Sequence, residues 1–350
     1  MKILITHEIY PPDKIGGGEI LIHRLAKELV RKGHSVKVLT TGNPRIKQYD
    51  GIKTIHLRAN RYLMNLLFPL IAYYARDVDV IQTTSGNACF PSWLASKLVN
   101  KPVCCLVNHV FGKYWKDVKG NFLGTVFQLF EKMFLARSYD KIVFQNFSSK
   151  KLGMDMGINS RRMSLIQPGI DFQKFQMKNV KKEPLVLFVG NFSMSKSMCE
   201  IKGLKYLIEA AKELPEIRFV IVGEGDYLNI LKKNAPSNVI FTGDLIGNSL
   251  IKLYNKASVF CLSSLAEGFG LTILEAMASG CTIVSTIDIG QEGIKIKPKD
   301  SKDIKKAIKY LISHQNTAEK MGEKNKKLAK KYTWSNYINQ FIKVYQTISK

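Results

Sequence analysis

The residues best suited to chemistry are two glutamates, Glu267 and Glu275, in the stretch SSLAEGFGLTILEAMASG (263–280). An ionised carboxylate is costly to remove from water unless it has a partner, yet this part of the chain is among the more apolar. Glu275 falls in the first turn or so of a predicted helix that is apolar on nearly every side. A glutamate that only complements the helix dipole would suit an exposed helix, not this one. Because two carboxylate oxygens match the paired hydroxyls of a sugar, we expect a binding role.

The loop between the two glutamates predicts an anion site. Gly268 and Gly270 allow a ligand to approach the backbone closely. The helix is expected to begin near Leu271 or Thr272, and the first amides of a helix have no acceptor within it. Such amides bind phosphate groups readily.

Strands and helices alternate on both sides of a charged segment at 176–184, the best linker candidate. The first half opens with a strand at 2–12, a glycine-rich turn and a helix at 19–34, followed by β-rich runs at 35–42, 79–86, 101–110 and 140–150. The helix carries an apolar stripe of Ile20, Ile22, Leu25, Leu29 and Val30.

The second half repeats this alternation from residue 185 to residue 286. Such a pattern indicates parallel sheets covered by helices on both faces, with ligands bound beyond the carboxyl ends of the strands. We therefore predict an α/β protein of two Rossmann-like domains facing a cleft. The N-terminal domain is placed at 1–178 and the C-terminal domain at 179–332, and the final helix at 333–350 is expected to pack back on the first domain.

The formal net charge of +25 over 350 residues indicates attraction to polyanions: nucleic acid, an anionic membrane or phosphorylated substrates. Residues 295–331 alone carry thirteen lysines and four acids, which we interpret as helices with solvated lysine faces. A nucleic-acid-binding protein is a rival hypothesis. It has no recognisable motif here, and the basic residues are spread widely, so we expect no nucleic-acid partner.

The six cysteines form no Cys-x-x-Cys pair and fall mostly in apolar runs, which favours free thiols in a reducing compartment. The start of the chain lacks the pattern of a signal peptide, and the apolar stretch 62–75 is too short to span a bilayer. We expect a cytoplasmic protein, with peripheral attachment to the inner face of the cytoplasmic membrane as an open alternative.

Taken in order, these motifs resemble a retaining glycosyltransferase of family 4, a nucleotide-sugar-dependent family with the two-domain GT-B architecture. The resemblance rests on the glutamate pair and covers nearly the whole chain. Its other parts are PPDKIGGGEILIHRLAKELVRKGHSVKVLT, LIQPGIDFQKF (165–175), LFVGNF with KGLKYLIEAA, VGEGDYLNILK, VIFTGDL and YTWSNYINQFIKVY.

The resemblance implies a role for each matching position. Glu275 would bind the ribose diol of the nucleotide, Glu267 would lie by the donor sugar, and Lys202 would neutralise the diphosphate. His109 would orient the donor sugar or the departing group, although a lone histidine after an apolar strand is often structural. Further donor contacts would come from the loop glycines Gly16 and Gly17, from Asn191, and from the amides of Gly268, Phe269, Gly270, Leu271 and Thr272.

Three positions depart from the family pattern. Asn191 stands where most relatives have an arginine that helps to hold the diphosphate. Either Lys202 carries more of that task, or Lys196 compensates. The segment 165–175 has Pro168-Gly169 in place of the usual asparagine, and the segment after residue 290 is shorter than usual. A sugar-nucleotide-binding protein without transfer activity is therefore a second rival, and an epimerase or phosphorylase of related fold is a nearer one.

The resemblance also implies the chemistry and the partners. A sugar would move with retention from a nucleoside diphosphate sugar to a hydroxyl of a glycan or glycolipid acceptor, and the diphosphate would take the proton. No metal or other cofactor is expected. Asp77 and Asp79 form an Asp-x-Asp, but they precede a buried strand without neighbouring ligands. Residues 56–76 and 113–141 combine aromatic, aliphatic and basic side chains, so they are either an interfacial patch for an anionic membrane or core helices.

Overall fold

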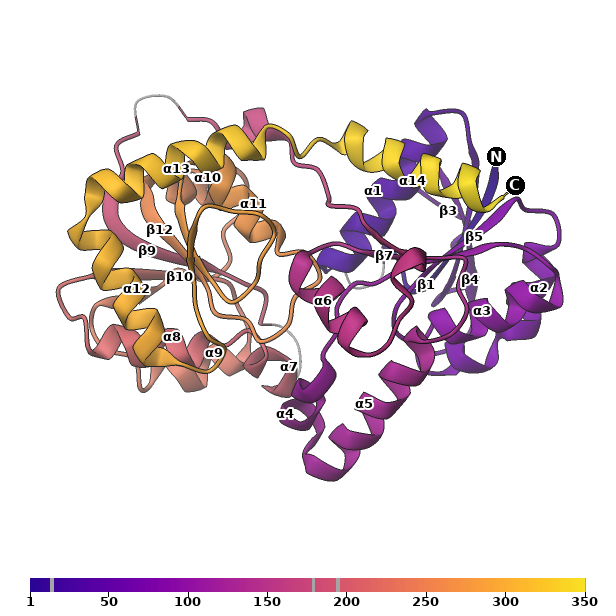
Figure 1. The fold of residues 1–350 in the computed structure, drawn as a ribbon, viewed down its shortest axis with the longest axis horizontal. Coiled ribbons are helices and arrows are strands. Elements are labelled where there is room, and N and C mark those ends of the chain that lie inside the picture. Colours follow the sequence, from indigo (N-terminus) through magenta and orange to yellow (C-terminus); the bar gives the residue numbers. More distant parts are fainter. Residues whose placement is uncertain (13–15, 178–179, 193–195, 350) are drawn as a thin grey trace. The chain divides into compact units, whose positions relative to one another are not determined.

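The computed structural model describes residues 1–12, 16–177, 180–192 and 196–349, so that part of the predicted linker (178–179) lies outside the described residues. The chain divides into two compact units (Figure 1). Unit 1 comprises Met1–Gly112, Gln128–Pro168 and Ser335–Lys350, and unit 2 comprises Lys113–Phe127 and Gly169–Trp334. Each unit is built on its own sheet, as the alternation of strands and helices predicted.

Unit 1 holds an eight-stranded sheet of order β3-β4-β2-β1-β5-β6-β7-β8. Its pairs are parallel except for β3 with β4. The central strands are almost fully buried, as expected for strands covered by helices on both faces. The strands are β1 (Lys2–Ile9), β2 (Ser35–Thr41), β3 (Gln48–Tyr49), β4 (Ile52–Leu57), β5 (Val80–Thr84), β6 (Val103–Leu106), β7 (Lys141–Phe144) and β8 (Met163–Leu165).

Helices cover both faces of this sheet: Figure 1 shows α1 and α14 above the strands and α2 and α3 below them. Helix α14 is fixed to the sheet by Tyr345, whose hydroxyl donates to Gln82 Oε1 at 2.8 Å. The helices of unit 1 are α1 (Gly17–Arg31), α2 (Phe68–Ala75), α3 (Cys89–Leu98), α6 (Phe147–Asp155) and α14 (Trp334–Ile348). Helix α5 (Asn121–Leu135) belongs to unit 2 up to Phe127 and to unit 1 from Gln128 onward. The short 3-10 turns of the chain are η1 (Leu63–Leu66), η2 (Gly112–Tyr114), η3 (Ser160–Arg162) and η4 (Phe172–Phe175).

The apolar stripe predicted for α1 is partly wrong. Ile20 and Val30 are exposed, and the buried face also includes Leu21 and Ala26. The reason is rotation: the buried positions 21, 22, 25, 26 and 29 follow the spacing of one helix face, whereas residues 20 and 30 fall on its edges.

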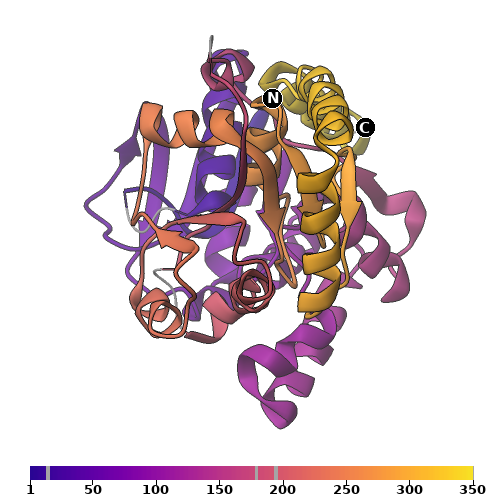
Figure 2. The ribbon, with the colours of Figure 1, turned by 90° about the vertical axis from the view of Figure 1, so that its left-hand side faces the viewer.

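Unit 2 holds a six-stranded parallel sheet of order β11-β10-β9-β12-β13-β14. Its strands are β9 (Glu183–Val189), β10 (Arg218–Val222), β11 (Val239–Phe241), β12 (Ala257–Leu262), β13 (Thr282–Ser285) and β14 (Gly293–Lys295). Figures 1 and 2 show helices on both faces. They are α7 (Lys196–Glu200), α8 (Leu204–Lys212), α9 (Asp226–Lys232), α10 (Gly247–Lys256), α11 (Leu271–Ala278), α12 (Ser301–Ser313) and α13 (Gln315–Ala329), and α4 (Trp115–Lys119) belongs to the same unit.

Both sheets have a point at which the strand order reverses. In unit 1 the chain builds outward from β1 in one direction and from β5 in the other, and in unit 2 the same reversal falls between β9 and β12. Ligands of open parallel sheets bind beyond the carboxyl ends of the strands at such points. In unit 2 those ends lead to Asn191 and to the loop that carries Glu267.

The six cysteines are free and buried, as predicted. The Asp-x-Asp motif lies at the amino end of β5, away from the carboxyl edge of its sheet. There Asp77 pairs with Lys2 Nζ at 2.8 Å, and Asp79 Oδ2 accepts from the Lys2 amide at 2.8 Å. Within the described residues, no group of three or more His, Cys, Asp or Glu side chains is placed to hold a metal ion.

Candidate active site

The segment before α8 and the loop after β12 are joined by close backbone contacts. Leu265 N donates to Ile201 O at 2.7 Å, and Ser263 Oγ donates to Gly203 O at 3.0 Å. Gly203 has φ +67, and a Cβ there would lie 2.0 Å from Ser263 O. Only glycine fits this position, since a side chain would be strained by its backbone angle and would collide with the neighbouring carbonyl.

This junction places Lys202 beside Glu267. Lys202 Nζ lies 2.7 Å from Glu267 Oε1, and Ser264 Oγ donates to the same oxygen at 2.9 Å. Both side chains of the ion pair are largely buried, with 22% and 15% of their surface exposed. A cation and a carboxylate separated by 65 positions in sequence therefore share one place at the carboxyl edge of the sheet.

The loop after Glu267 leads directly into the amino end of α11. Gly270 is the N-cap, with φ +89, and the helix begins at Leu271 as the sequence predicted. Leu271 and Thr272 are partly exposed, whereas Phe269 is buried with its ring 6.2 Å from that of Tyr332. The amide of Ile273 already donates to the Gly270 carbonyl at 2.8 Å, whereas the amides of Leu271 and Thr272 precede the first bond of the helix, so this end is suited to an anion.

Glu275 is the fifth residue of α11, and the first turn holds no acid. This position agrees with the expected one in the first turn or so of the helix, and the dipole alone does not explain this glutamate. Its Oε2 accepts a 2.7 Å hydrogen bond from the hydroxyl of Tyr254, the last buried aromatic of α10. Burial raises the pKa of Glu275 to about 7, and the Tyr254 hydrogen bond offsets part of that rise.

Asn191 lies just beyond the carboxyl end of β9, the strand that pairs with β12. It is exposed, as is Lys196 at the start of the five-residue helix α7. Gly190, between β9 and Asn191, has its carbonyl 2.0 Å from the position that a Cβ on Gly223 would take, so β9 and β10 end in close contact.

The predicted residues of unit 1 follow two strands of its own sheet. Gly16 is the N-cap of α1, and its amide donates to Glu19 Oε2 at 2.9 Å. A Cβ on Gly17 would meet nothing within 4 Å among the described residues, so these contacts do not require glycine there. His109 follows β6 and is partly buried, with its ring 4.4 Å from that of Phe111.

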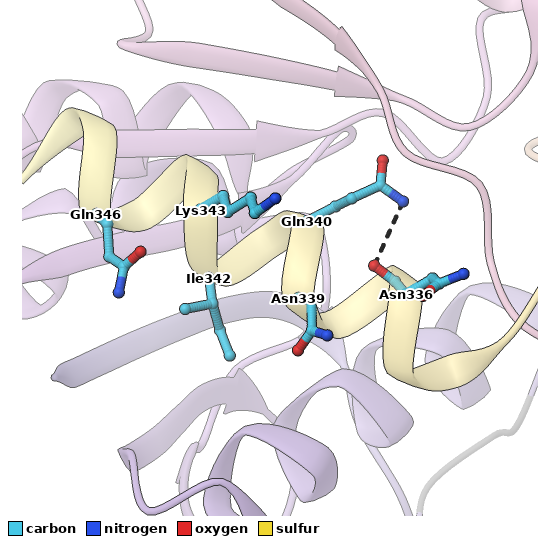
Figure 3. Close-up of a pocket in the computed structure, with 6 residues that line it drawn as sticks. All are labelled: Asn336, Asn339, Gln340, Ile342, Lys343 and Gln346. Atoms are coloured by element: carbon cyan, nitrogen blue, oxygen red, sulfur yellow. Dashed lines mark hydrogen bonds between the residues drawn. The ribbon is translucent and has the colours of Figure 1, made fainter.

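Three residues that hold this site in place were not singled out from the sequence: Ser264, Gly203 and Tyr254. Gly203 directly follows Lys202, and Ser264 lies three positions before Glu267. Their closeness in sequence to these two predicted residues could have identified them. Tyr254 had none, because it lies 21 positions from Glu275 on another helix. A shallow hollow on α14 contains none of the predicted residues (Figure 3). Its lining comes from this one helix: Asn336, Asn339, Gln340, Ile342, Lys343 and Gln346.

Unit 2 thus combines a sheet reversal, a largely buried Lys202–Glu267 pair and the amino end of α11. Two family models match the chain in sequence order: "Glycosyltransferase Family 4" over residues 15–174 and "Glycosyl transferases group 1" over residues 169–328. The chain belongs to the family 4 glycosyltransferases and is a glycosyltransferase of class EC 2.4.

Curated relatives agree with this assignment. The chain is 25% identical to the uncharacterized glycosyltransferase MJ1607 of Methanocaldococcus jannaschii, over 99% of this chain and 98% of that protein. It is 24% identical to the alpha-monoglucosyldiacylglycerol synthase of Streptococcus pneumoniae, over 81% and 71% of the two chains. It is 28% identical to an Escherichia coli UDP-Gal:alpha-D-GlcNAc-diphosphoundecaprenol alpha-1,3-galactosyltransferase, over 60% and 58%.

Solved structures agree on the fold. HepE from Anabaena, crystallised in complex with UDP and glucose, superposes with a TM-score of 0.75 at 17% identity, over 99% of this chain and 100% of that chain. The predicted GT-B fold class is thereby confirmed.

Proposed function

We propose that this glycosyltransferase moves a sugar from a nucleoside diphosphate sugar to a hydroxyl of a lipid-linked acceptor, with retention at the anomeric carbon. The observation that carries the proposal is the Lys202–Glu267 pair at 2.7 Å beside the amino end of α11. Lys202 and the α11 amides provide positive charge for a departing diphosphate, and Glu267 provides an acceptor for donor-sugar hydroxyls. Groups held in place in this way stabilise developing charge without reorganising.

Glu275 binds the ribose of the donor in this proposal. It lies two turns or less from the helix end that would meet the diphosphate, and its side chain is only partly exposed. In unit 1, Gly16 and Gly17 leave the backbone accessible to the donor, and His109 orients the sugar or the leaving group. The diphosphate oxygen receives the acceptor proton, and no metal or other cofactor takes part.

A lipid-linked acceptor is supported by the names of two relatives, a glucosyldiacylglycerol synthase and a diphosphoundecaprenol galactosyltransferase. The chain has its own surface suited to such a partner. Helix α5 exposes six large apolar side chains, among them Phe122 at 81%. This α5 apolar face consists of Phe122, Leu123, Phe127, Leu129, Phe130 and Met133.

A second apolar surface, the η1–α2 patch, follows β4 in unit 1 and consists of Tyr62, Leu63, Leu66, Leu70 and Tyr73. Residues 51–76 contain four basic residues and no acid. Near α5, the two acids of residues 113–135 are engaged: Asp117 pairs with Lys299 at 2.5 Å, and Glu131 accepts from the amides of Phe111 and Gly112. Arg61, one of the four basic residues, pairs with Glu8, and the other three are Lys53, Arg58 and Arg76. Exposed apolar side chains in segments that carry an excess of basic residues suit the interface of an anionic membrane.

Within the described residues, no helix is long and apolar enough to cross a bilayer. We therefore propose peripheral attachment through the α5 apolar face and the η1–α2 patch. Flotation with liposomes of phosphatidylglycerol and phosphatidylcholine tests it: the protein should float with the anionic vesicles at low salt and less at high salt. Absence of salt-sensitive flotation would end this part of the proposal.

The donor is tested by thermal shift with UDP-, GDP- and ADP-sugars. One nucleotide class should raise the melting temperature of the wild type, and Glu275→Ala should lose that shift, since a ligand stabilises only the state that it binds. Transfer is tested by release of nucleoside diphosphate when a glycolipid acceptor is added, and retention by the anomeric configuration of the product. A protein that binds the donor but releases nothing with any lipid-linked acceptor would be a binder and not a catalyst.

A further inference from the structure

Tyr254 is a buried residue whose hydroxyl donates a hydrogen bond to the carboxylate of Glu275. Among the described residues, no other side chain donates a hydrogen bond to this carboxylate. Its ring is fully buried, 6.1 Å from the ring of Phe175 in η4 and 5.8 Å from that of Phe260 in β12. Helix α10 is otherwise largely exposed until this last turn. The helix therefore enters the core at the point where Tyr254 meets Glu275.

The backbone of Tyr254 is held as firmly as its ring. Its carbonyl accepts from Lys182 Nζ at 3.1 Å and from Cys281 Sγ at 3.1 Å. The next residue, Asn255, donates from Nδ2 to Phe175 O at 3.0 Å and to Ile251 O at 2.9 Å. The ring is thus fixed from η4 and β12, and the backbone by η4 and by the residues directly before β9 and β13, so the hydroxyl has little freedom of its own.

We infer that Tyr254 is a positioning residue for the nucleotide: its hydroxyl fixes the carboxylate of Glu275 so that one oxygen faces the ribose diol of a ribonucleoside diphosphate. This inference rests on the proposed function of Glu275. A carboxylate held by one donor keeps a single orientation, and it keeps lone pairs for two further donors, which is what a cis-diol offers. Without the hydroxyl, the Glu275 side chain gains rotamers and loses a donor that favours its charged form.

The phenol must be the donor in this pair. Burial and the nearby carboxylate raise the pKa of Tyr254 well above its usual range, so the hydroxyl keeps its proton whenever Glu275 is ionised. The titratable groups behind the pair are Lys182 and Cys281, which contact the Tyr254 carbonyl. Burial lowers the pKa of the Lys182 ammonium and raises that of the Cys281 thiol.

The test is Tyr254→Phe, which removes one oxygen and keeps the ring. Calorimetric titration with UDP, GDP and ADP identifies the nucleotide that binds the wild type, and the same titration is then made with its 2′,3′-dideoxy analogue. We expect Y254F to bind the ribonucleotide about ten-fold more weakly at pH 7, as befits the loss of one hydrogen bond to a charged group. The dideoxy analogue, which has no diol, should bind both proteins alike.

A pH series gives a second readout that a merely structural tyrosine would not move. Ribonucleotide affinity of the wild type should rise as pH passes through about 7, where Glu275 ionises. In Y254F the rise should occur at higher pH, because the carboxylate has lost the hydrogen bond that lowers its pKa.

Tyr345→Phe is the matched control. Tyr345 is also fully buried, and its hydroxyl donates to a side chain, Gln82, but it belongs to unit 1. Y345F should lose melting temperature as Y254F does and keep the wild-type nucleotide affinity. Equal losses of ribonucleotide and dideoxynucleotide binding in Y254F, or none, would overturn the inference while leaving the proposed function standing. A wild type that binds none of the three nucleotides would overturn both.

Discussion

Two kinds of region in this protein differ in how their side chains are held. One is the set of loops after β9 and β12 in unit 2, and the other consists of the α5 apolar face and the η1–α2 patch. In the first region, charged groups are held by neighbours: Lys202 by Glu267, Glu267 by Ser264, and Glu275 by Tyr254. In the second, large side chains such as Phe122 and Leu66 point outward with 81% and 70% of their surface exposed.

The difference indicates two kinds of partner. Groups fixed before a ligand arrives suit a small polar ligand that must be held in one pose, such as a nucleotide sugar. Exposed apolar side chains with cations nearby suit a partner that is itself a fluid surface, where one exact geometry is not needed. The comparison predicts that the two regions can be impaired separately.

The largest effect is expected at Lys202. Lys202→Met should lower the rate of sugar transfer about 10²–10³-fold, the usual cost of removing a group that stabilises developing charge in an active site. It should leave flotation with anionic liposomes unchanged. The measurement is release of nucleoside diphosphate under saturating donor.

Lys196→Met is the control for that variant, since Lys196 is an exposed lysine between the same strand and helix. It should cost less than about three-fold in rate, the small effect of an exposed charge. If the two variants lose activity equally, the diphosphate is not held by the Lys202–Glu267 pair alone, and Lys196 compensates for Asn191.

The next effect concerns stability and pH. Burial raises the pKa of Glu275 in the folded state from 4.5 to about 7. Below pH 4.5 the residue is protonated both folded and unfolded and costs nothing. As pH rises from 4.5 to 7, only the unfolded chain ionises, so the free energy of unfolding falls by about 3 kcal/mol and then levels off.

Glu275→Gln should abolish that fall, because glutamine does not titrate. Urea unfolding at pH 5 and pH 8, without nucleotide, should therefore show the variant gaining about 3 kcal/mol on the wild type between the two pH values. Parallel stabilities at both pH values would mean that Glu275 is hydrated in the folded protein. The same variant should bind no ribonucleotide tightly, which links this region to the donor.

A moderate effect is expected on the α5 apolar face. The pair Phe122→Ser and Phe130→Ser should weaken liposome binding about ten-fold or more, because burying each aromatic ring in an interface is worth about 1.5–3 kcal/mol. Nucleotide affinity should not change. Ile246→Ser, which removes an exposed apolar side chain from unit 2, is the control and should float like the wild type. Equal flotation of all these proteins would locate membrane binding elsewhere.

The smallest effect is a gain. Asn191→Arg restores the charge that most family members have after this strand, at an exposed site beside β9. Nucleoside diphosphate affinity should rise a few-fold, about 1 kcal/mol, as expected for one added charge-assisted contact near the surface. Nucleosides without phosphate should bind as before. A gain that is equal for nucleosides would mean that residue 191 does not face the phosphates.

The sequence by itself determined the fold class and most of the regular elements. The alternation of apolar runs and helical stripes marks β1, α1, β2 and the series from β9 to β13 except the short helix α7, because period and turn residues are local properties of the chain. It also identified the start of α11 at Leu271, since glycine-rich turns before an apolar helix are equally local. Ile20 and Val30 show the limit of such a prediction. An apolar stripe predicts that a helix is present, but which residues at the edges of the stripe are buried depends on what packs against the helix.

Only the tertiary structure decided how the charged groups are held. Lys202 meets Glu267 because Gly203 can lie against the Ser263 carbonyl, a contact between segments about sixty residues apart. Tyr254 meets Glu275 because two helices enter the same core, which no periodicity in either helix indicates. The exposure of the α5 apolar face could not be predicted from the sequence either, because an apolar helix has the same sequence pattern whether it packs in a core or contacts a membrane.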